Sequence, residues 1–191
     1  MARKKTILKE QILNGAYDFV SKNGFNNLTA RSLAAHIGSS TQPIYLEFQN
    51  MDDLKKELYA QIYQNLENQS YLGNSSECTL TNLALNIVQF SKVEPKLYQA
   101  LLLDENTAEK QLHDFSYQMF NRVINDNPKY KDCDQEVLAS LLNGIWIVTT
   151  GLATLGSTGA IMADIESQRG IINETINLIL SKKETFLDIK A

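Results

Sequence analysis

The chain has 191 residues, of which 43% are hydrophobic and 21% are charged, and its formal net charge is −4 at pH 7. This composition is that of a globular protein with one or two domains, which at this length buries a core without a metal or a disulfide. Cys78, Cys133, His36 and His113 stand far apart in the sequence, so we expect two reduced thiols, no zinc site and no cofactor.

The N-terminal part of the sequence has helical periodicity throughout. Apolar residues recur at three- and four-residue steps from Leu8 to Val20, and Gly24 stops this first helix. Thr29 is the expected N-cap of a second, short helix that Gly38 ends. The helices expected in this part cover about 6–23, 29–38, 39–48 and 52–71.

The remaining sequence is also helical in pattern, and no β alternation or internal repeat appears. Apolar stripes predict five further helices, over about 80–90, 95–101, 108–123, 135–155 and 161–182. The stretch 135–155 is apolar over more than half of its circumference, which predicts burial on two sides. We therefore predict an all-α fold of about nine helices, with an N-terminal three-helix helix-turn-helix domain (1–50) and a C-terminal helical bundle (51–191).

The charges are distributed unevenly along the chain. Residues 1–50 contain six basic and three acidic residues, a net charge of +3, whereas residues 51–191 carry a net charge of −7. A basic N-terminal quarter on an acidic body indicates that this end of the protein meets a polyanion.

Residues 39–48 read S-S-T-Q-P-I-Y-L-E-F and follow a short helix and a glycine, which is the spacing of a helix-turn-helix. Ser39 or Ser40 is the expected N-cap of the second helix, and Pro43 fits its first turn because an amide there has no partner within the helix. Ile44 and Phe48 are four residues apart and are expected to pack inward.

In a helix-turn-helix the N-terminal end of the second helix enters the major groove of DNA. Glutamine there can bind adenine, and threonine or proline carbon atoms can contact a thymine methyl group. Tyr45 can place its hydroxyl on a phosphate, and the start of the preceding helix is a second phosphate site. The residues predicted to contact DNA are Thr29, Arg31, Ser39, Ser40, Thr41, Gln42, Pro43 and Tyr45.

Three of these residues have a plainer interpretation, which the sequence leaves open. Tyr45 fits equally an aromatic of the core with a wet tip. Arg31 fits a solvated surface residue, and Ser39 fits a cap and nothing more. Helix-turn-helix shapes also occur in proteins that do not bind DNA.

Residues 6–58 resemble the DNA-binding domain of the TetR (tetracycline repressor) family of bacterial regulators. The resemblance rests on Gly24, Leu28-Thr29, Leu33-Ala34, Gly38, Ile44-Tyr45, Phe48 and Leu54. It implies a homodimeric transcriptional repressor that binds operator DNA and that an unknown small molecule releases from the DNA. It also implies that the helices 135–155 and 161–182 form the dimer interface. Two positions depart from the family pattern: Met51 replaces a common lysine, and Glu47 replaces a histidine or basic residue.

A pocket for that small molecule is expected between helices of the bundle, lined by aromatic and apolar groups with a few polar ones. The residues predicted to line it are Tyr59, Tyr63, Phe90, Tyr98, Phe115, Phe120, Trp146 and Thr149. Each of them could instead be an ordinary core or interface residue. The pattern favours an uncharged, fairly apolar effector.

Enzymatic activity is not expected. The stretch from Gly151 to Ser157 resembles the start of a phosphate-binding loop, but the lysine is missing and a helix precedes it in place of a strand. We interpret its glycines as sites of close helix packing and as the end of the helix. Neither histidine has a nucleophile or a carboxylate at a recognisable spacing. The alternative to a regulator is a helical ligand-binding or adaptor protein without specific DNA binding.

The sequence predicts a cytoplasmic protein without a membrane partner. The basic residues Arg3-Lys4-Lys5 are not followed by the apolar run of a signal peptide. The apolar stretch Ile145–Leu155 is interrupted by polar residues and is shorter than the roughly 20 residues that a membrane span needs.

Overall fold

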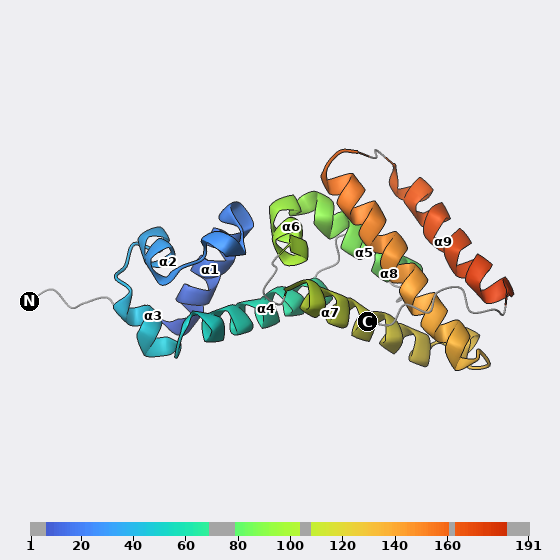
Figure 1. Ribbon diagram of the computed structural model, residues 1–191, viewed down its shortest axis with the longest axis horizontal. Coiled ribbons are helices and arrows are strands. Elements are labelled where there is room, and N and C mark those ends of the chain that lie inside the picture. The colour runs from blue at the N-terminus through green and yellow to red at the C-terminus, as the bar shows by residue number, and fades with distance from the viewer. Residues whose placement is uncertain (1–6, 69–78, 104–107, 161–162, 183–191) are drawn as a thin grey trace, which may run out of the picture. The chain divides into compact units, whose positions relative to one another are not determined.

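The computed structural model describes residues 7–68, 79–103, 108–160 and 163–182, and in these ranges the predicted all-α fold of about nine helices is confirmed, with no strand. The α-helices are α1 (Lys9–Asn23), α2 (Ala30–His36), α3 (Gln42–Glu47), α4 (Met51–Asn68), α5 (Leu80–Val93), α6 (Pro95–Leu103), α7 (Ala108–Asp126), α8 (Gln135–Ser157) and α9 (Ile165–Lys182). Two single 3₁₀ turns, η1 (Phe25–Asn27) and η2 (Pro128–Tyr130), follow α1 and α7. Figure 1 labels the α-helices.

The helices form two compact units, which are described separately. The first unit spans residues 1–69 together with 96–106, so it contains α1 to α4 and also α6. The second spans residues 70–95 and 107–191 and contains α5, α7, α8 and α9. The boundary predicted at residue 50 divides a DNA-binding part from a ligand-binding and dimerisation part. This division by function stays a prediction.

Local signals define the short helices of the first unit. Gly24 ends α1 with a φ of +77°, a conformation that residues with a side chain rarely adopt. Thr29 caps α2 as predicted, because its hydroxyl oxygen accepts a hydrogen bond from the Ser32 amide at 3.1 Å. At the other end of α2, Gly38 has a φ of +66°, and the Ser39 amide donates to the Ala34 carbonyl at 2.8 Å, as in a Schellman motif.

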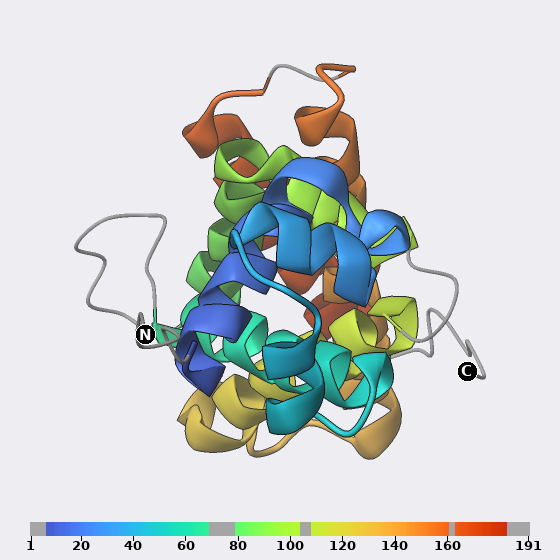
Figure 2. The same cartoon turned by 90° about the vertical axis from the view of Figure 1, so that its left-hand side faces the viewer.

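A shared core holds α1, α2, α3 and α4 together (Figures 1 and 2, blue to teal). Ile12, Leu33, Ile44 and Leu58 are almost completely buried in it. Gly15 lies where α1 approaches the end of α2, since a Cβ atom there would come within 2.3 Å of Ile37 Cγ2. The helix-turn-helix is therefore packed closely onto α1.

In the second unit, α8 packs against α5, α7 and α9, and α9 lies alongside it in Figure 1. This arrangement confirms the two-sided burial predicted for 135–155. The closest approach is at Gly144, where a Cβ atom would lie 2.5 Å from Ile179 Cδ1 of α9. The prediction of close packing at Gly151 was wrong within the chain, because a Cβ atom there would have no neighbour within 4 Å.

Several helix boundaries differ from the predicted ones because capping groups decide them. The last helix begins at Ile165, where Asp164 Oδ1 accepts a hydrogen bond from the Ser167 amide at 2.7 Å; residue 161 lies outside the described residues. The long helix of the first unit begins at Met51, because Asn50 Oδ1 accepts from the Asp53 amide at 2.8 Å. Its predicted end at residue 71, like the predicted cap Thr6, also falls outside the described ranges.

Helix α8 continues to Ser157 and has 23 residues, so it is longer than the stretch considered for a membrane span. Among the described residues it is the one helix whose length and apolar composition would allow it to cross a membrane. Its contacts with α5, α7 and α9 account for the apolar residues that it buries, whereas Ile147 and Leu155 are exposed.

Candidate nucleic-acid interface

Helix α3 separates apolar from polar side chains as predicted. Ile44 and Phe48 are 1% and 2% exposed and anchor the helix in the core of the first unit. Tyr45 and Leu46 are 56% and 76% exposed, and Gln42 is exposed one turn earlier on the same side. We call Gln42, Tyr45 and Leu46 the outer face of α3. The exposure of Tyr45 removes the alternative that it is a core residue.

The start of α3 differs from the expected one. Its N-cap position is Thr41, with no side-chain capping bond, so the prediction that Ser39 or Ser40 caps the helix was wrong. The Schellman turn after α2 uses the Ser39 amide, and the Ser39 hydroxyl donates to the Ser40 carbonyl at 3.1 Å. Pro43 does lie in the first turn of α3, as predicted. Thr41 and Pro43 are half-buried, and Ser40 is exposed.

The other two predicted DNA contacts lie on α2 and at its start. Thr29 is exposed, but its hydroxyl is engaged as the cap and lies 2.9 Å from Ser32 Oγ. Arg31 is exposed, and within the described part of the chain its guanidinium makes no hydrogen bond or ion pair. Arg31 is thus an available cation beside the helix-turn-helix.

Two lysines of the first fifty residues are paired with carboxylates of the same chain. Lys9 Nζ lies 2.5 Å from Glu57 Oε1 and above the Phe48 ring, and its hydrogen bond with Glu57 raises the pKa of Lys9. Lys22 Nζ lies 2.7 Å from Asp18 Oδ1. Both pairs are largely solvated, so they contribute little to the stability of the fold. Their carboxylates nevertheless offset two of the positive charges that a polyanion could meet.

Asp18 also binds His36, whose Nε2 lies 2.8 Å from Asp18 Oδ2. Hydrogen bonds from Lys22 and then His36 lower the pKa of Asp18 below its ordinary value. The sequence spacing of 18 residues gives no signal of this pair, because the packing of α2 on α1 brings the two side chains together. His113 Nδ1 lies 3.4 Å from the neighbouring Asp114.

Three further residues, Leu46 on α3 and Lys55 and Lys56 on α4, were not predicted as contacts. Leu46 could have been found from its position four residues after Gln42, on the side opposite the buried pair. Lys55 and Lys56 follow the start of α4 and carry the only basic side chains, besides Arg31, among residues 29–56. Glu47, Asp52 and Asp53 offset these three cations, so the stretch has no net charge.

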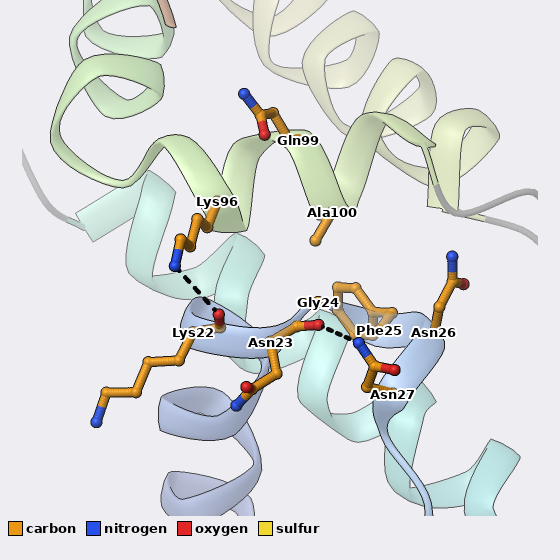
Figure 3. A pocket seen from close by; sticks show the side chains of 9 residues that line it. All are labelled: Lys22, Asn23, Gly24, Phe25, Asn26, Asn27, Lys96, Gln99 and Ala100. Atoms are coloured by element: carbon orange, nitrogen blue, oxygen red, sulfur yellow. Dashed lines mark hydrogen bonds between the residues drawn. The ribbon is translucent and has the colours of Figure 1, made fainter. Parts of the chain in front are cut away.

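A cavity of about 300 Å³ lies in the first unit where α6 meets the end of α1 (Figure 3). Lys96 of α6 points to the last turn of α1 and donates to the Lys22 carbonyl at 3.5 Å, and Asn27 donates to the Asn23 carbonyl at 2.7 Å. A cation at a helix C-terminus is favourable because the carbonyl groups there carry partial negative charge. This hydrogen bond connects α6 to α1, on which the helix-turn-helix packs.

The residues predicted to line an effector pocket are divided between the units. Tyr59, Tyr63 and Tyr98 belong to the first unit, where the Tyr59 ring stacks on Phe25 at 4.6 Å. The second unit contains the other five, Phe90, Phe115, Phe120, Trp146 and Thr149. None of the eight lines the cavity in Figure 3 or the two other cavities described for these units.

Two side chains of the second unit indicate where a ligand could be accommodated. Thr149 and Ser116 are buried, and their hydroxyl oxygens have no hydrogen-bond partner among the described residues. Buried hydroxyls without a partner are uncommon and are candidates for binding a ligand or a water molecule. Trp146, in contrast, is half-buried and packs edge-on against the His113 ring at 5.2 Å.

No group of three His, Cys, Asp or Glu side chains within the described ranges is placed to hold a metal ion. Cys133 is half-buried and free, and Cys78 lies outside these ranges.

The whole fold is similar to solved structures of transcriptional regulators. A TetR-family regulator from Vibrio parahaemolyticus is 20% identical, with a TM-score of 0.61 over 88% of this chain and 96% of that chain. A TetR transcription regulator from Haloarcula marismortui, also 20% identical, has a TM-score of 0.63 over the same shares. DhaS, a dihydroxyacetone kinase operon activator, is 15% identical, with a TM-score of 0.58 over 91% of this chain and 94% of that chain. No family model matches the sequence, and no curated protein matches it either.

Proposed function

We propose that this chain, which has the fold of the TetR-family regulators, is a sequence-specific DNA-binding transcriptional regulator. The observation that carries the proposal is the orientation of α3, which buries Ile44 and Phe48 and exposes Gln42, Tyr45 and Leu46. A helix anchored by two residues, with amide, phenol and aliphatic groups outward, suits reading of base edges in a major groove. We expect it to act as a repressor that a small molecule releases.

The decisive experiment measures binding to the DNA upstream of the protein's own gene against scrambled DNA. The variants Gln42→Ala and Tyr45→Phe should weaken specific binding, with a loss of about 1–3 kcal/mol for each glutamine–adenine contact. Their melting temperatures should stay close to that of the wild type because both side chains are exposed. Gln118→Ala and Tyr117→Phe on the exposed side of α7 are matched controls that should bind normally.

Equal and weak binding of the wild type to both DNAs would favour a distant binding site or the adaptor alternative. The absence of net charge in residues 29–56 is the observation on the side of that alternative. A search of random DNA sequences for an enriched site separates the two possibilities. A reporter gene behind the bound site then distinguishes the expected repression from activation.

Arg31 is proposed as a phosphate contact. Each contact that is lost from a protein–DNA complex reduces the slope of log K against log salt by about 0.9. Arg31→Ala in a homodimer removes two such contacts, so its slope should be smaller by about 2. An unchanged slope would leave Arg31 as a solvated surface residue.

We propose that α8 and α9 form the homodimer interface. Their exposed apolar side chains follow helical spacing, with Ile147 and Leu155 on α8 and Ile171 and Leu178 on α9. Ile171→Glu together with Leu178→Glu should give monomers in analytical ultracentrifugation. Val93→Glu in α5 is the matched control, because Val93 is 63% exposed but lies outside these helices. Monomeric wild-type protein, or dimers of the double variant, would contradict the assignment.

Thr149 is proposed as the polar group of an effector site in the second unit. Thr149→Val removes a buried hydroxyl without a partner, so the stability of the free protein should be unchanged or higher. The compound that raises the wild-type melting temperature in a ligand screen should raise that of the variant less. An equal response of both proteins would exclude Thr149 from the site.

A further inference from the structure

A polar cavity of about 420 Å³ lies in the second unit, away from the aromatic residues discussed above. Its walls are the first turn of α5, the segment around η2 and one side of α9. Leu80 and Ile176 are its apolar residues, and the remaining lining side chains are hydroxyls, amides, one phenol and two cations. No carboxylate lines the cavity, although the protein as a whole is acidic.

The two cations are Lys129 in η2 and Arg169 on α9. Arg169 Nη1 donates to Asn82 Oδ1 of α5 at 2.9 Å, and its Nε lies 3.6 Å from Glu166. Lys129 Nζ lies 5.8 Å from the centre of the Tyr130 ring and has no ion pair within the described residues. Arg169 is thus partly balanced by Glu166, whereas the exposed Lys129 has no acidic partner among the described residues.

Hydrogen bonds within the cavity wall use amide oxygens and leave amide NH₂ donors available to a ligand. Thr81 Oγ1 donates to Asn173 Oδ1 at 2.6 Å, and the Lys129 amide donates to Asn127 Oδ1 at 3.0 Å. The side-chain oxygens of Asn173 and Asn127 are thus engaged, and their NH₂ groups remain as donors. The first turn of α5, which Thr79 caps, adds backbone N–H groups that have no partner within the helix.

Tyr130 adds a phenol hydroxyl to the polar groups of the cavity. It lines the cavity and is only 5% exposed, yet its hydroxyl has no hydrogen-bond partner among the described residues. A phenol is protonated at neutral pH and can donate, and burial raises the pKa of Tyr130 further. The Tyr130 ring is buried, whereas its hydroxyl oxygen stays accessible from the cavity, whose other polar groups are mainly donors.

We propose that this cavity binds a small anion whose phosphate or carboxylate group lies between Lys129, Arg169 and Tyr130. The volume exceeds that of an inorganic anion, and the polar walls suit a body that carries hydroxyl groups. The expected ligand class is a sugar-sized phosphate ester or a hydroxycarboxylate. The proposal goes beyond DNA binding and does not rest on it, since binding is measured without DNA.

The test is calorimetric titration of the full chain at constant ionic strength with glucose 6-phosphate, citrate and uncharged glucose. One of the two anions should bind saturably with a Kd below about 1 mM, and glucose should not bind. Binding of the ester alone or of citrate alone identifies the anionic group. Lys129→Met should weaken binding about tenfold or more, because it removes a charged donor.

Two further variants keep the test specific. Tyr130→Phe preserves the ring, so the free protein should melt near the wild-type temperature while its affinity falls severalfold. Lys131→Met makes the same charge change two residues from Lys129, at an exposed position that does not line the cavity, and should bind like the wild type. No saturable binding of either anion, or an equal loss in Lys131→Met and Lys129→Met, would overturn the proposal.

Discussion

In the first unit α2 and α3 have seven and six residues, whereas in the second unit α8 and α9 have 23 and 18. Isolated helices shorter than about 12–15 residues are marginal in water, so α2 depends on its Thr29 cap and on Gly38, and α3 depends on its buried side chains. Helices α8 and α9 are held by long apolar contacts along their length.

This difference in helix length indicates which positions of each unit tolerate substitution. In the helix-turn-helix, two anchors and a cap fix the geometry, and the outer face of α3 is free to vary with the DNA that it contacts. In α8 and α9 the buried residues recur along the whole length of each helix, and exposed apolar positions of both helices are assigned to the dimer.

Gly15→Ala should have the largest effect on stability. The new Cβ would lie 2.3 Å from Ile37 Cγ2, and Ile37 is β-branched and forms the C-cap of α2, so it cannot rotate away easily. Overpacking of this kind costs about 1–3 kcal/mol, which outweighs a gain of up to about 1 kcal/mol in helix propensity. Denaturant unfolding measures the change, and an increase in stability would show that α1 and α2 are packed loosely.

Gly144→Ala in α8 should cost less, although its Cβ would lie 2.5 Å from an atom of α9. That atom is the terminal methyl group of Ile179, which can change rotamer at a cost of about 0.5–1.5 kcal/mol. The gain in helix propensity offsets most of this cost, so we expect a net change within about 1 kcal/mol. Gly170→Ala in α9, with nothing within 4 Å, is the control and should stabilise. A loss at Gly144 larger than that at Gly15 would reverse the comparison.

The cap variants Thr29→Ala and Thr79→Ala remove the same type of hydrogen bond in the two units. Each should destabilise its helix by about 1 kcal/mol. In hydrogen exchange, we expect the whole of α2 to lose protection in the first variant and only the first turn of the longer α5 in the second. Thr29→Ser retains the capping oxygen and should behave like the wild type. Equal, local effects in both helices would show that α2 does not depend on its cap.

The smallest effect concerns Asp18 and Asp164, whose pKa values are both lowered. Lys22 and His36 lower the pKa of Asp18, whereas hydrogen bonds from Ser167 lower that of Asp164. A carboxylate whose pKa is lowered in the folded state stabilises the protein above about pH 4, its unfolded pKa. This stabilisation is lost as the pH falls through the folded pKa. In 1 M salt the Debye length is about 3 Å, so the pKa of Asp18 should return toward its ordinary value more than that of Asp164. Titration followed by NMR measures both, and equal shifts would contradict this assignment.

The sequence by itself determined the local features of the protein. Helical periodicity predicts the helices, Gly24 and Gly38 predict where α1 and α2 stop, and the spacing of Ile44 and Phe48 predicts which side of α3 is buried. These features depend on backbone conformation and on neighbours three or four residues away, which the sequence shows directly.

Only the tertiary structure decided the features that join distant residues. The pairing of Asp18 with His36, the close approach at Gly144 and the attachment of α6 to α1 each bring together elements whose spacing carries no signal. The same holds for the cavity at Tyr130, since its walls come from three separate segments. A side chain's partner across the fold depends on how helices pack, and packing is a property of the whole chain.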